Sequence, residues 1–232
     1  MSSMNEQWAP ILRQTEAYYT AKVREHGATA RGVDWNSDES QQLRFRQLLR
    51  LTEGATQPFS INDFGCGYGA LVEYLHTRGY AFSYHGFDLS PAMIKQARTR
   101  YGHLPYCRFS TDSEALSPAD YTVASGIFNV RLNTADEQWQ AYLLATLDWL
   151  ASYSRQGFAF NALTTYSDAE RMRPDLYYAD PCFLFDYCQR RYSRWVAVLH
   201  DYGLYEFTVL IRKEGEKAWL SSSCSERETS PA

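Results

Sequence analysis

Two classes of protein are disfavoured by what this sequence has little of. Its 23 Lys and Arg against 27 Asp and Glu give a net charge of −4, and no stretch is strongly basic. Nucleic-acid binding depends on clustered basic side chains, so we expect no nucleic-acid partner. No apolar run is long enough to span a bilayer, and the first residues do not resemble a signal peptide. We therefore expect a cytoplasmic protein that does not associate with membranes.

Cysteine and histidine are also too few and too scattered to form a recognisable site. The five cysteines are an odd number without a C-x-x-C pair, and the five histidines show no metal-ligand spacing. A disulfide framework and a zinc site are both disfavoured, and we expect a reduced, metal-free chain. Aromatic residues are abundant instead, at 16% with 18 tyrosines, and they must occupy a core or a pocket.

From residue 59 onward, short apolar runs alternate with helical segments. Strands are expected at 59–64, 83–88, 105–109, 121–128 and 157–163, and helices at 70–79, 90–102 and 136–153. This alternation is typical of a parallel sheet with right-handed crossovers and helices on both faces. The last two expected strands, 195–201 and 205–213, are joined by too few residues for a crossover and must be antiparallel. The sequence thus predicts an α/β fold whose mostly parallel sheet has an antiparallel final strand.

Further segments flank this alternating unit. A helix is expected at 7–25, and Asn36 and Glu39 have the spacing of a capping box that opens a second helix. We divide the chain into an N-terminal helical cap at 1–54, a ligand-binding domain at 55–213 and a tail at 214–232. The tail is polar and is expected to be disordered. Within the domain, an insert at about 164–194 is expected on the substrate side.

The stretch INDFGCGYGA places three glycines, Gly65, Gly67 and Gly69, at alternate positions after an acid, Asp63. Glycine is costly to order and is used where φ must be positive or the backbone must approach a neighbour closely. A strand that ends in such a turn and opens a helix forms a ligand-binding corner at the carboxyl edge of a sheet. A pyrophosphate would be repelled by Asp63, whereas a cationic ligand would be attracted to it.

Two further acids follow the next strands. Asp88 closes the second expected strand, where a carboxylate can accept both hydroxyls of a ribose. Asp112 follows the third strand and is placed to receive an adenine amino group, although a plain helix cap explains it equally well. Together with the glycine turn, these positions indicate a site for a nucleoside.

The segments DFGCGYG and GFDLSPAMI resemble the first two motifs of the class I S-adenosylmethionine-dependent methyltransferases. The resemblance covers roughly residues 55–213 and implies a Rossmann-like, seven-stranded sheet with S-adenosylmethionine as cofactor. It implies cofactor contacts at the following positions: Asp63, Gly65, Gly67, Gly69, Asp88, Leu89, Met93, Asp112, Ser113 and Ser125.

These implied contacts differ in kind along the cofactor. Asp63 would face the amino group of the methionine part, with the first two glycines giving backbone access to it. Asp88 would hold the ribose, and Asp112 with Ser113 would read the adenine edge. Leu89 and Met93 would pack near the adenine, although ordinary core positions explain these two equally well. Ser125 would lie beneath the sulfonium.

Catalytic candidates are sought outside the common sheet because the activated cofactor carries the difficult chemistry. The protein has to align the reactants, exclude water and, for a protonated acceptor, supply a base. The segment after the fourth strand, Ser-Gly-Ile-Phe-Asn-Val, lacks the Asn/Asp-Pro-Pro-Tyr of methyltransferases that act on nucleic-acid or protein amides. The candidates are Asn161 and His200, near the ends of the fifth and sixth expected strands, and Tyr178 of the insert and Tyr18 of the cap. A lid over the pocket and ordinary core packing explain equally well these two tyrosines and Tyr166, Tyr177, Tyr19 and Trp35.

Three functions fit this sequence. The first is a methyltransferase that acts on a small molecule in an enclosed pocket. The second is an enzyme on the same fold that uses S-adenosylmethionine as its sole substrate, cyclising it to azetidine-2-carboxylic acid with release of methylthioadenosine. The third is a non-catalytic S-adenosylmethionine sensor. The retained cofactor corner and the elaborate cap favour an enzyme over the sensor.

Overall fold

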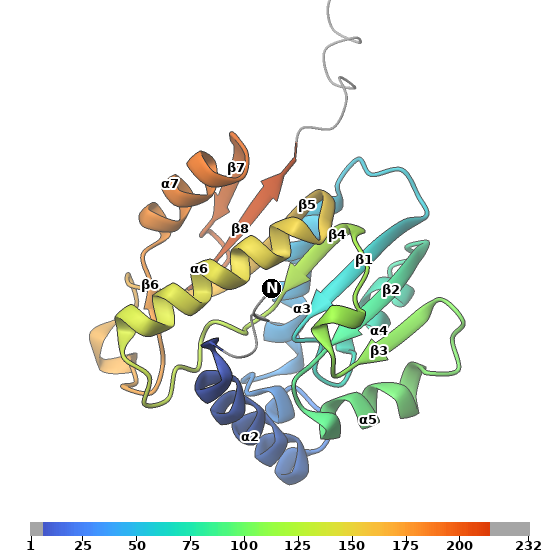
Figure 1. Cartoon of the computed structure of the whole chain (residues 1–232), viewed down its shortest axis with the longest axis horizontal. Helices are drawn as coiled ribbons and strands as arrows, with labels where there is room; N and C mark the ends of the chain where they lie inside the picture. The colour runs from blue at the N-terminus through green and yellow to red at the C-terminus, as the bar shows by residue number, and fades with distance from the viewer. Residues whose placement is uncertain (1–6, 214–232) are drawn as a thin grey trace, which may run out of the picture.

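A computed structural model describes residues 7–213 of the chain, and the expected disordered tail at 214–232 lies outside the described residues. One twisted sheet organises the fold (Figure 1). Its strands are β1 (Phe59–Phe64), β2 (Phe82–Phe87), β3 (Cys107–Ser110), β4 (Ala119–Ala124), β5 (Ser154–Thr164), β6 (Tyr178–Ala179), β7 (Trp195–Leu199) and β8 (Glu206–Arg212). They are arranged in the order β3-β2-β1-β4-β5-β8-β7, and the two-residue β6 pairs with β5.

The strand directions confirm the expected topology. Strands β1 to β5 form parallel pairs, whereas β8 lies antiparallel to both β5 and β7. The short β6 adds a parallel pair to the end of β5 that the sequence did not indicate, because two residues carry no periodic pattern. The carboxyl ends of β1, β2, β4 and β5 therefore meet at one edge of the sheet.

Helices cover both faces of the sheet, as expected. They are α2 (Ala9–His26), α3 (Asp38–Leu48), α4 (Ala70–Thr77), α5 (Pro91–Tyr101), α6 (Asp136–Ser152) and α7 (Pro181–Arg191). Phe158 and Phe160 of β5 point to a core that includes residues of α6 and α7, while Ala159 between them joins the core under α3, α4 and α5. The alternation of apolar side chains along β5 thus fills two cores, one on each face.

Local sequence signals explain where most helices begin. Ser90 accepts a hydrogen bond from the Met93 amide with Pro91 at the first helical position, and Asp180 caps α7 in the same way before Pro181. The capping box of α3 was predicted one residue too early. Ser37, rather than Asn36, has the extended backbone and exchanges side-chain hydrogen bonds with Ser40.

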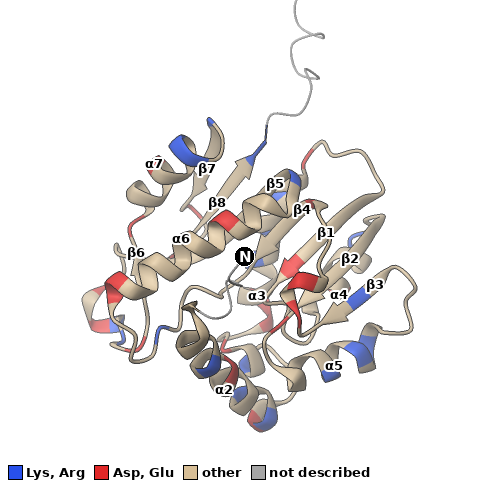
Figure 2. Cartoon of the chain, viewed as in Figure 1, with Lys and Arg blue, Asp and Glu red and all other residues tan. Residues whose placement is uncertain are grey.

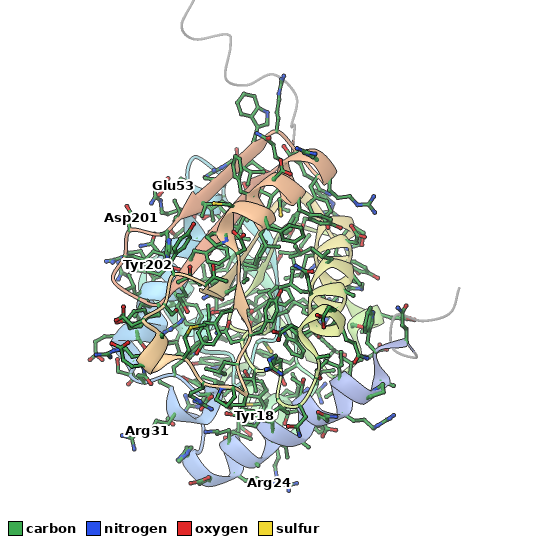
Figure 3. All side chains as sticks on the ribbon, turned by 90° about the vertical axis from the view of Figure 1, so that its left-hand side faces the viewer. Tyr18, Arg24, Arg31, Glu53, Asp201 and Tyr202 are labelled. Atoms are coloured by element: carbon green, nitrogen blue, oxygen red, sulfur yellow. The ribbon has the colours of Figure 1, made fainter. Side chains whose placement is uncertain are left out.

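The expected N-terminal cap consists of two differently placed helices. In Figure 1, α2 lies beside the carboxyl ends of the central strands, with Tyr18 on the side that Figure 3 presents. Helix α3 instead packs against β5, β8 and α4 and contributes Phe45 and Leu48 to a core. Between them, the short helix η1 (Arg31–Val33) brings Val33 and Trp35 toward the glycine turn.

Charged side chains are mixed over the fold. On the face drawn in Figure 2, acidic and basic positions are interspersed along the helices and loops. Within residues 7–213, no helix is both long enough and apolar enough to cross a membrane.

Candidate functional site

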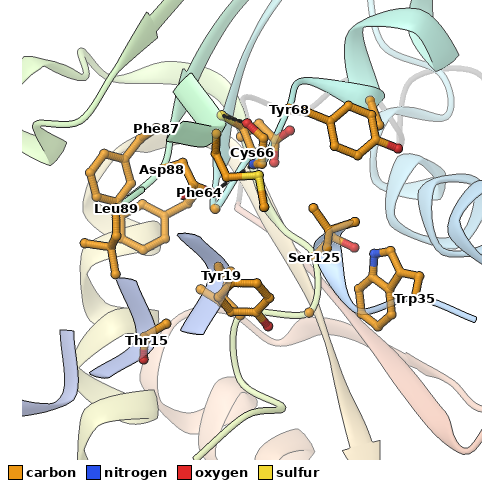
Figure 4. Close-up of a pocket in the computed structure, with 18 of the residues that line it drawn as sticks. Thr15, Tyr19, Trp35, Phe64, Cys66, Tyr68, Phe87, Asp88, Leu89 and Ser125 are labelled. Atoms are coloured by element: carbon orange, nitrogen blue, oxygen red, sulfur yellow. Dashed lines mark hydrogen bonds between the residues drawn. The ribbon is translucent and has the colours of Figure 1, made fainter. Parts of the chain in front are cut away.

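A pocket lies at the carboxyl ends of β1, β2 and β4, where the sheet edge meets the N-terminal helices (Figure 4). The strand ends and the following turns supply many of the residues that the sequence singled out: Asp63, Gly65, Gly67, Asp88, Leu89, Met93 and Ser125. The N-terminal segment closes the other side with Thr15, Glu16, Tyr19, Val33, Trp35 and Gln41. For Tyr19 and Trp35 the sequence left a lid and core packing equally open, and both line this pocket.

The glycine turn has the backbone that only glycine adopts freely. Gly65, Gly67 and Gly69 have φ values of 86°, 55° and 83°. A Cβ atom on Gly65 would lie 2.2 Å from Cγ2 of Ile127, and one on Gly67 would lie 2.8 Å from Cγ1 of Val33. The glycines therefore serve both the positive φ and the close approach of neighbouring segments. Gly69 is the N-cap residue that precedes α4, and it does not line the pocket.

Asp63 is a buried carboxylate at the end of β1. It accepts a hydrogen bond of 2.7 Å from the Tyr84 hydroxyl. Burial raises the pKa of Asp63 to about 7, a shift that the Tyr84 bond opposes and the nearby Asp88 increases. A cationic group placed beside Asp63 would favour its ionised form, which makes the position suitable for an ammonium group.

Asp88 connects the end of β2 to the glycine turn. One carboxylate oxygen accepts from the Gly67 amide and the other from the Ser90 amide, each at 2.8 Å. Burial raises the pKa of Asp88 to about 6 against these two bonds, which lower it. Each oxygen keeps a lone pair for a further donor, so the carboxylate can both order the turn and accept hydroxyl groups.

The remaining positions implied for the cofactor fall into two groups. Leu89 and the buried Met93 line the pocket beside Asp88. Asp112 and Ser113 do not line it. Asp112 is exposed and caps the short helix η3 (Ser113–Ala115) by accepting from the Glu114 amide at 2.9 Å. The structure therefore brings the glycine turn, Asp88 and the end of β4 together but leaves Asp112 and Ser113 outside the pocket.

The end of β4 forms the side of the pocket opposite Asp88. The strand ends at Ala124 rather than at the predicted residue 128 because Gly126, with φ of 76°, turns the chain. The Ser125 hydroxyl is buried and has no hydrogen-bond partner. The Trp35 ring packs so closely on Gly126 that a Cβ there would lie 2.3 Å from it. An unpaired buried hydroxyl calls for an explanation, and a ligand that supplies the missing partner is one.

None of the four predicted catalytic side chains lines this pocket. Asn161 is fully buried. Its side chain accepts a hydrogen bond from the Gly126 backbone amide and donates one to the Glu206 carboxylate. Tyr178 accepts from the Arg173 amide, and Tyr18 donates to Asp34. His200 is exposed and packs near Tyr166 and Phe207.

Sequence reasoning missed several pocket residues on the helices. Glu16 of α2 and Tyr142 of α6 line the pocket, as do Gln41 of α3 and Tyr68 of the glycine turn. The Tyr68 hydroxyl donates to Oε1 of Gln41 at 2.9 Å. One signal was available, because Tyr68 lies inside the glycine motif. The others sit in ordinary amphipathic helices, where periodicity does not distinguish a core position from a pocket position.

Comparison with known proteins links this geometry to a family. A family model described as a methyltransferase domain matches residues 61–152, from β1 to the end of α6. A curated protein of Mycobacterium tuberculosis (strain ATCC 25618 / H37Rv), named "Putative methyltransferase Rv1506c", is 58% identical over 159 residues. That match covers 68% of this chain and 96% of the relative.

Solved methyltransferases share the fold at low sequence identity. Magnesium protoporphyrin IX methyltransferase (ChlM) from Synechocystis PCC 6803, with bound S-adenosylmethionine, aligns with a TM-score of 0.62 at 13% identity, covering 88% of this chain and 97% of that one. The N-methyltransferase NodS from Bradyrhizobium japonicum WM9, bound to S-adenosylhomocysteine, aligns with a TM-score of 0.61 at 16% identity, covering 87% and 99%. These similarities confirm the sheet architecture expected from the sequence.

Proposed function

As a member of the class I S-adenosylmethionine-dependent methyltransferases, this chain uses S-adenosylmethionine as its cofactor, and we propose that it methylates a small molecule in an enclosed pocket. One observation carries the proposal. Side chains of the N-terminal segment, including Tyr19 and Trp35, line the same pocket as the glycine turn. An acceptor that reaches this pocket must fit among them, which favours a compact molecule over a nucleic acid or a protein surface.

The residues at the sheet edge fit this cofactor. Asp63 suits the ammonium group, Asp88 has lone pairs for ribose hydroxyls, and the unpaired Ser125 hydroxyl lies at the end of β4. Tyr19 and Trp35 supply aromatic faces that attract a cation. When bound, the cofactor supplies a methyl group activated by a sulfonium.

The protein's own contribution is to position the cofactor and the acceptor and to enclose them in the pocket. The glycine turn and Asp88 form one hydrogen-bonded unit that fixes where a nucleoside can lie. Tyr19 and Tyr142 line the pocket, and we expect their rings to exclude water once the ligands are bound, which would strengthen electrostatic interactions inside it. Glu16 is the lining carboxylate on α2, and we propose it as the group that accepts a proton from a protonated acceptor.

The charges of the pocket support an uncharged or cationic acceptor. Its lining carboxylates are Glu16, Asp63 and Asp88, and among the described residues it is lined by no Lys, Arg or His. An organic acid would meet no counter-charge from the protein there. The names of two fold neighbours, a magnesium protoporphyrin IX methyltransferase and an N-methyltransferase, are compatible with a small acceptor.

The test is a product analysis by mass spectrometry. The protein is incubated with S-adenosylmethionine alone and with the small-molecule or macromolecular fraction of a cell extract. We expect S-adenosylhomocysteine and a methylated product only with the small-molecule fraction. Formation of methylthioadenosine from S-adenosylmethionine alone would contradict methyl transfer and support cyclisation. Methylation only in the macromolecular fraction would exclude a small acceptor. Gly65→Ala, which places a methyl group in the cofactor corner, is the inactive control.

A further inference from the structure

A buried network connects the N-terminal segment to the end of β4 through the last strand. Its centre is Glu206, the first residue of β8, which is fully buried. One carboxylate oxygen accepts from Nε of Arg44 on α3 at 2.9 Å. The other accepts from Nδ2 of Asn161 on β5 at 3.3 Å. A single carboxylate thus joins residues that are far apart in the sequence.

Asn161 links Glu206 to a residue that lines the pocket. Its Oδ1 accepts a 2.7 Å hydrogen bond from the amide of Gly126, which lines the pocket. An asparagine side chain can face the Gly126 amide with either its oxygen or its NH₂ group, and only the oxygen accepts. Glu206 selects this orientation because the opposite end of the amide must then donate to its carboxylate.

Arg44 makes the second connection to the same glycine. Its guanidinium lies 3.8 Å from the centre of the Trp35 ring, and the ring packs on Gly126. The Ser40 carbonyl accepts a further bond of 2.9 Å from the guanidinium. Gly126 is therefore contacted by both Asn161 and Trp35, and Glu206 bonds Asn161 directly and bonds the arginine that stacks on Trp35.

Stability alone does not explain this arrangement. The Arg44 side chain is only 8% exposed and that of Glu206 is fully buried, so both charges have lost their hydration. Burial raises the pKa of Glu206 although Arg44 and Asn161 oppose that shift. Buried ion pairs of this kind are often no better for stability than apolar residues of the same size.

We propose that Glu206 is a positioning residue for methyl transfer, which fixes the Gly126 amide through Asn161 and the Trp35 ring through Arg44. The role in turnover rests on the proposed function, whereas the effect on Gly126 does not depend on it. Asn161 is then a positioning residue too, because both ends of its amide are engaged inside the protein.

The test replaces the ion pair by apolar residues of similar size, R44M together with E206L. Hydrogen exchange of the Gly126 amide is measured by NMR in the ligand-free protein, and S-adenosylhomocysteine affinity by calorimetry. We expect a modest fall in melting temperature, because the volume is kept and no charge is left unpaired, although the buried NH₂ group of Asn161 loses its acceptor. Gly126 exchange should accelerate on the order of tenfold, as expected for a weakened hydrogen bond, and the affinity should fall.

A structural role alone predicts a different result. If the double variant keeps wild-type exchange at Gly126 and wild-type affinity, the proposal is wrong. Should the double variant fail to fold, E206Q provides the same readouts against D120N. Asp120 accepts hydrogen bonds from the amide and hydroxyl of Ser60 at the other end of β4, so its loss destabilises without touching Gly126. Equal acceleration at Gly126 in E206Q and D120N would also overturn the proposal.

Turnover adds a third readout once an acceptor is known. We expect the R44M/E206L variant to have a lower kcat while its KM for the acceptor changes less. An unchanged kcat in a variant with faster exchange at Gly126 would refute the role of Glu206 in methyl transfer. If the wild-type protein did not bind S-adenosylhomocysteine, the cofactor assignment would be contradicted. The exchange measurement would still test the effect of Glu206 on Gly126, because it is made in the ligand-free protein.

Discussion

The hydroxyl of Tyr84 on β2 donates a 2.7 Å hydrogen bond to the carboxylate of Asp63 on β1. The bond crosses between neighbouring strands of the sheet and lies at the start of the glycine turn. A single neutral donor does not compensate for burial, and the pKa of Asp63 stays raised, at about 7. Near pH 7, the ligand-free site therefore holds Asp63 as a mixture of its protonated and ionised forms. A bound ammonium group would stabilise the ionised form.

Asp63→Asn should change the pH dependence of stability. In the folded protein the pKa of Asp63 is about 7, against its ordinary value of 3.8, so the protonated form contributes stability at low pH. This contribution is lost as the pH rises from about 4 to about 7, on the order of 1 kcal/mol for each unit. Asparagine does not titrate and still accepts the Tyr84 bond. The free energy of unfolding of the variant, measured in urea, should therefore rise relative to the wild type between pH 5 and pH 8.

The same variant should bind S-adenosylhomocysteine more weakly at pH 8, because it cannot offer a negative charge to the amino group. Tyr84→Phe is the matched control, since it removes the hydrogen bond but keeps the carboxylate. A variant that loses no affinity at pH 8 would show that Asp63 does not face the amino group. A stability difference that stays constant with pH would show that its pKa is not raised.

Asp88→Ala should weaken binding of S-adenosylhomocysteine by about 1–3 kcal/mol, through lost hydrogen bonds to a charged group. Its carboxylate also orders the Gly67 and Ser90 amides, so a small loss of stability should accompany the loss of affinity. Asp112→Ala is the comparison, because Asp112 is exposed and caps η3 outside the pocket. We expect it to change the affinity less than about threefold by calorimetry. Equal losses in both variants would place the adenine edge at Asp112.

A comparison of Gly65→Ala with Gly79→Ala separates the cost of backbone strain from the cost of a steric clash. Both glycines have positive φ, 86° and 73°, and a side chain in this region costs about 1–2 kcal/mol. A Cβ at Gly79 meets nothing within 4 Å, whereas at Gly65 it would lie 2.2 Å from Ile127. Gly79→Ala should therefore show the strain alone in thermal unfolding. Gly65→Ala should cost more, and Ile127→Ala should relieve the difference in the double variant. Equal costs for the two single variants would mean that Ile127 simply moves away.

The sequence predicted the fold well because its signals are local. In the structure, the capping residues Ser90 and Asp180 and the alternating burial around Phe158 each act within a few residues of the chain. The capping box at α3 failed by one residue, because Asn36 and Ser37 are both good caps and only the backbone conformation separates them. The short β6 has no local signal at all.

The pocket was predicted only where a motif carries it. Gly65 and Asp88 belong to segments whose spacing points to a ligand, and both line the pocket. The connection from Arg44 through Glu206 to Asn161 was not predictable, since it joins three elements that meet only when the sheet is complete. Asn161 and His200 were chosen because they end strands, a criterion that gives the edge of the sheet but not the direction of a side chain.

Tyr18→Phe should affect stability more than turnover. The Tyr18 hydroxyl donates a 2.7 Å hydrogen bond to Asp34, which also forms an ion pair with Lys22. Burial raises the pKa of Tyr18, and Asp34 raises it further, which disfavours the phenolate that a base would require. We expect a loss of about 1 kcal/mol in the free energy of unfolding, and turnover within about threefold of wild type. Asp34→Asn, which weakens the same contact from its other side, should behave alike. A fall in kcat of about a hundredfold in Tyr18→Phe alone, without a matching fall in Asp34→Asn, would identify Tyr18 as a catalytic acid or base.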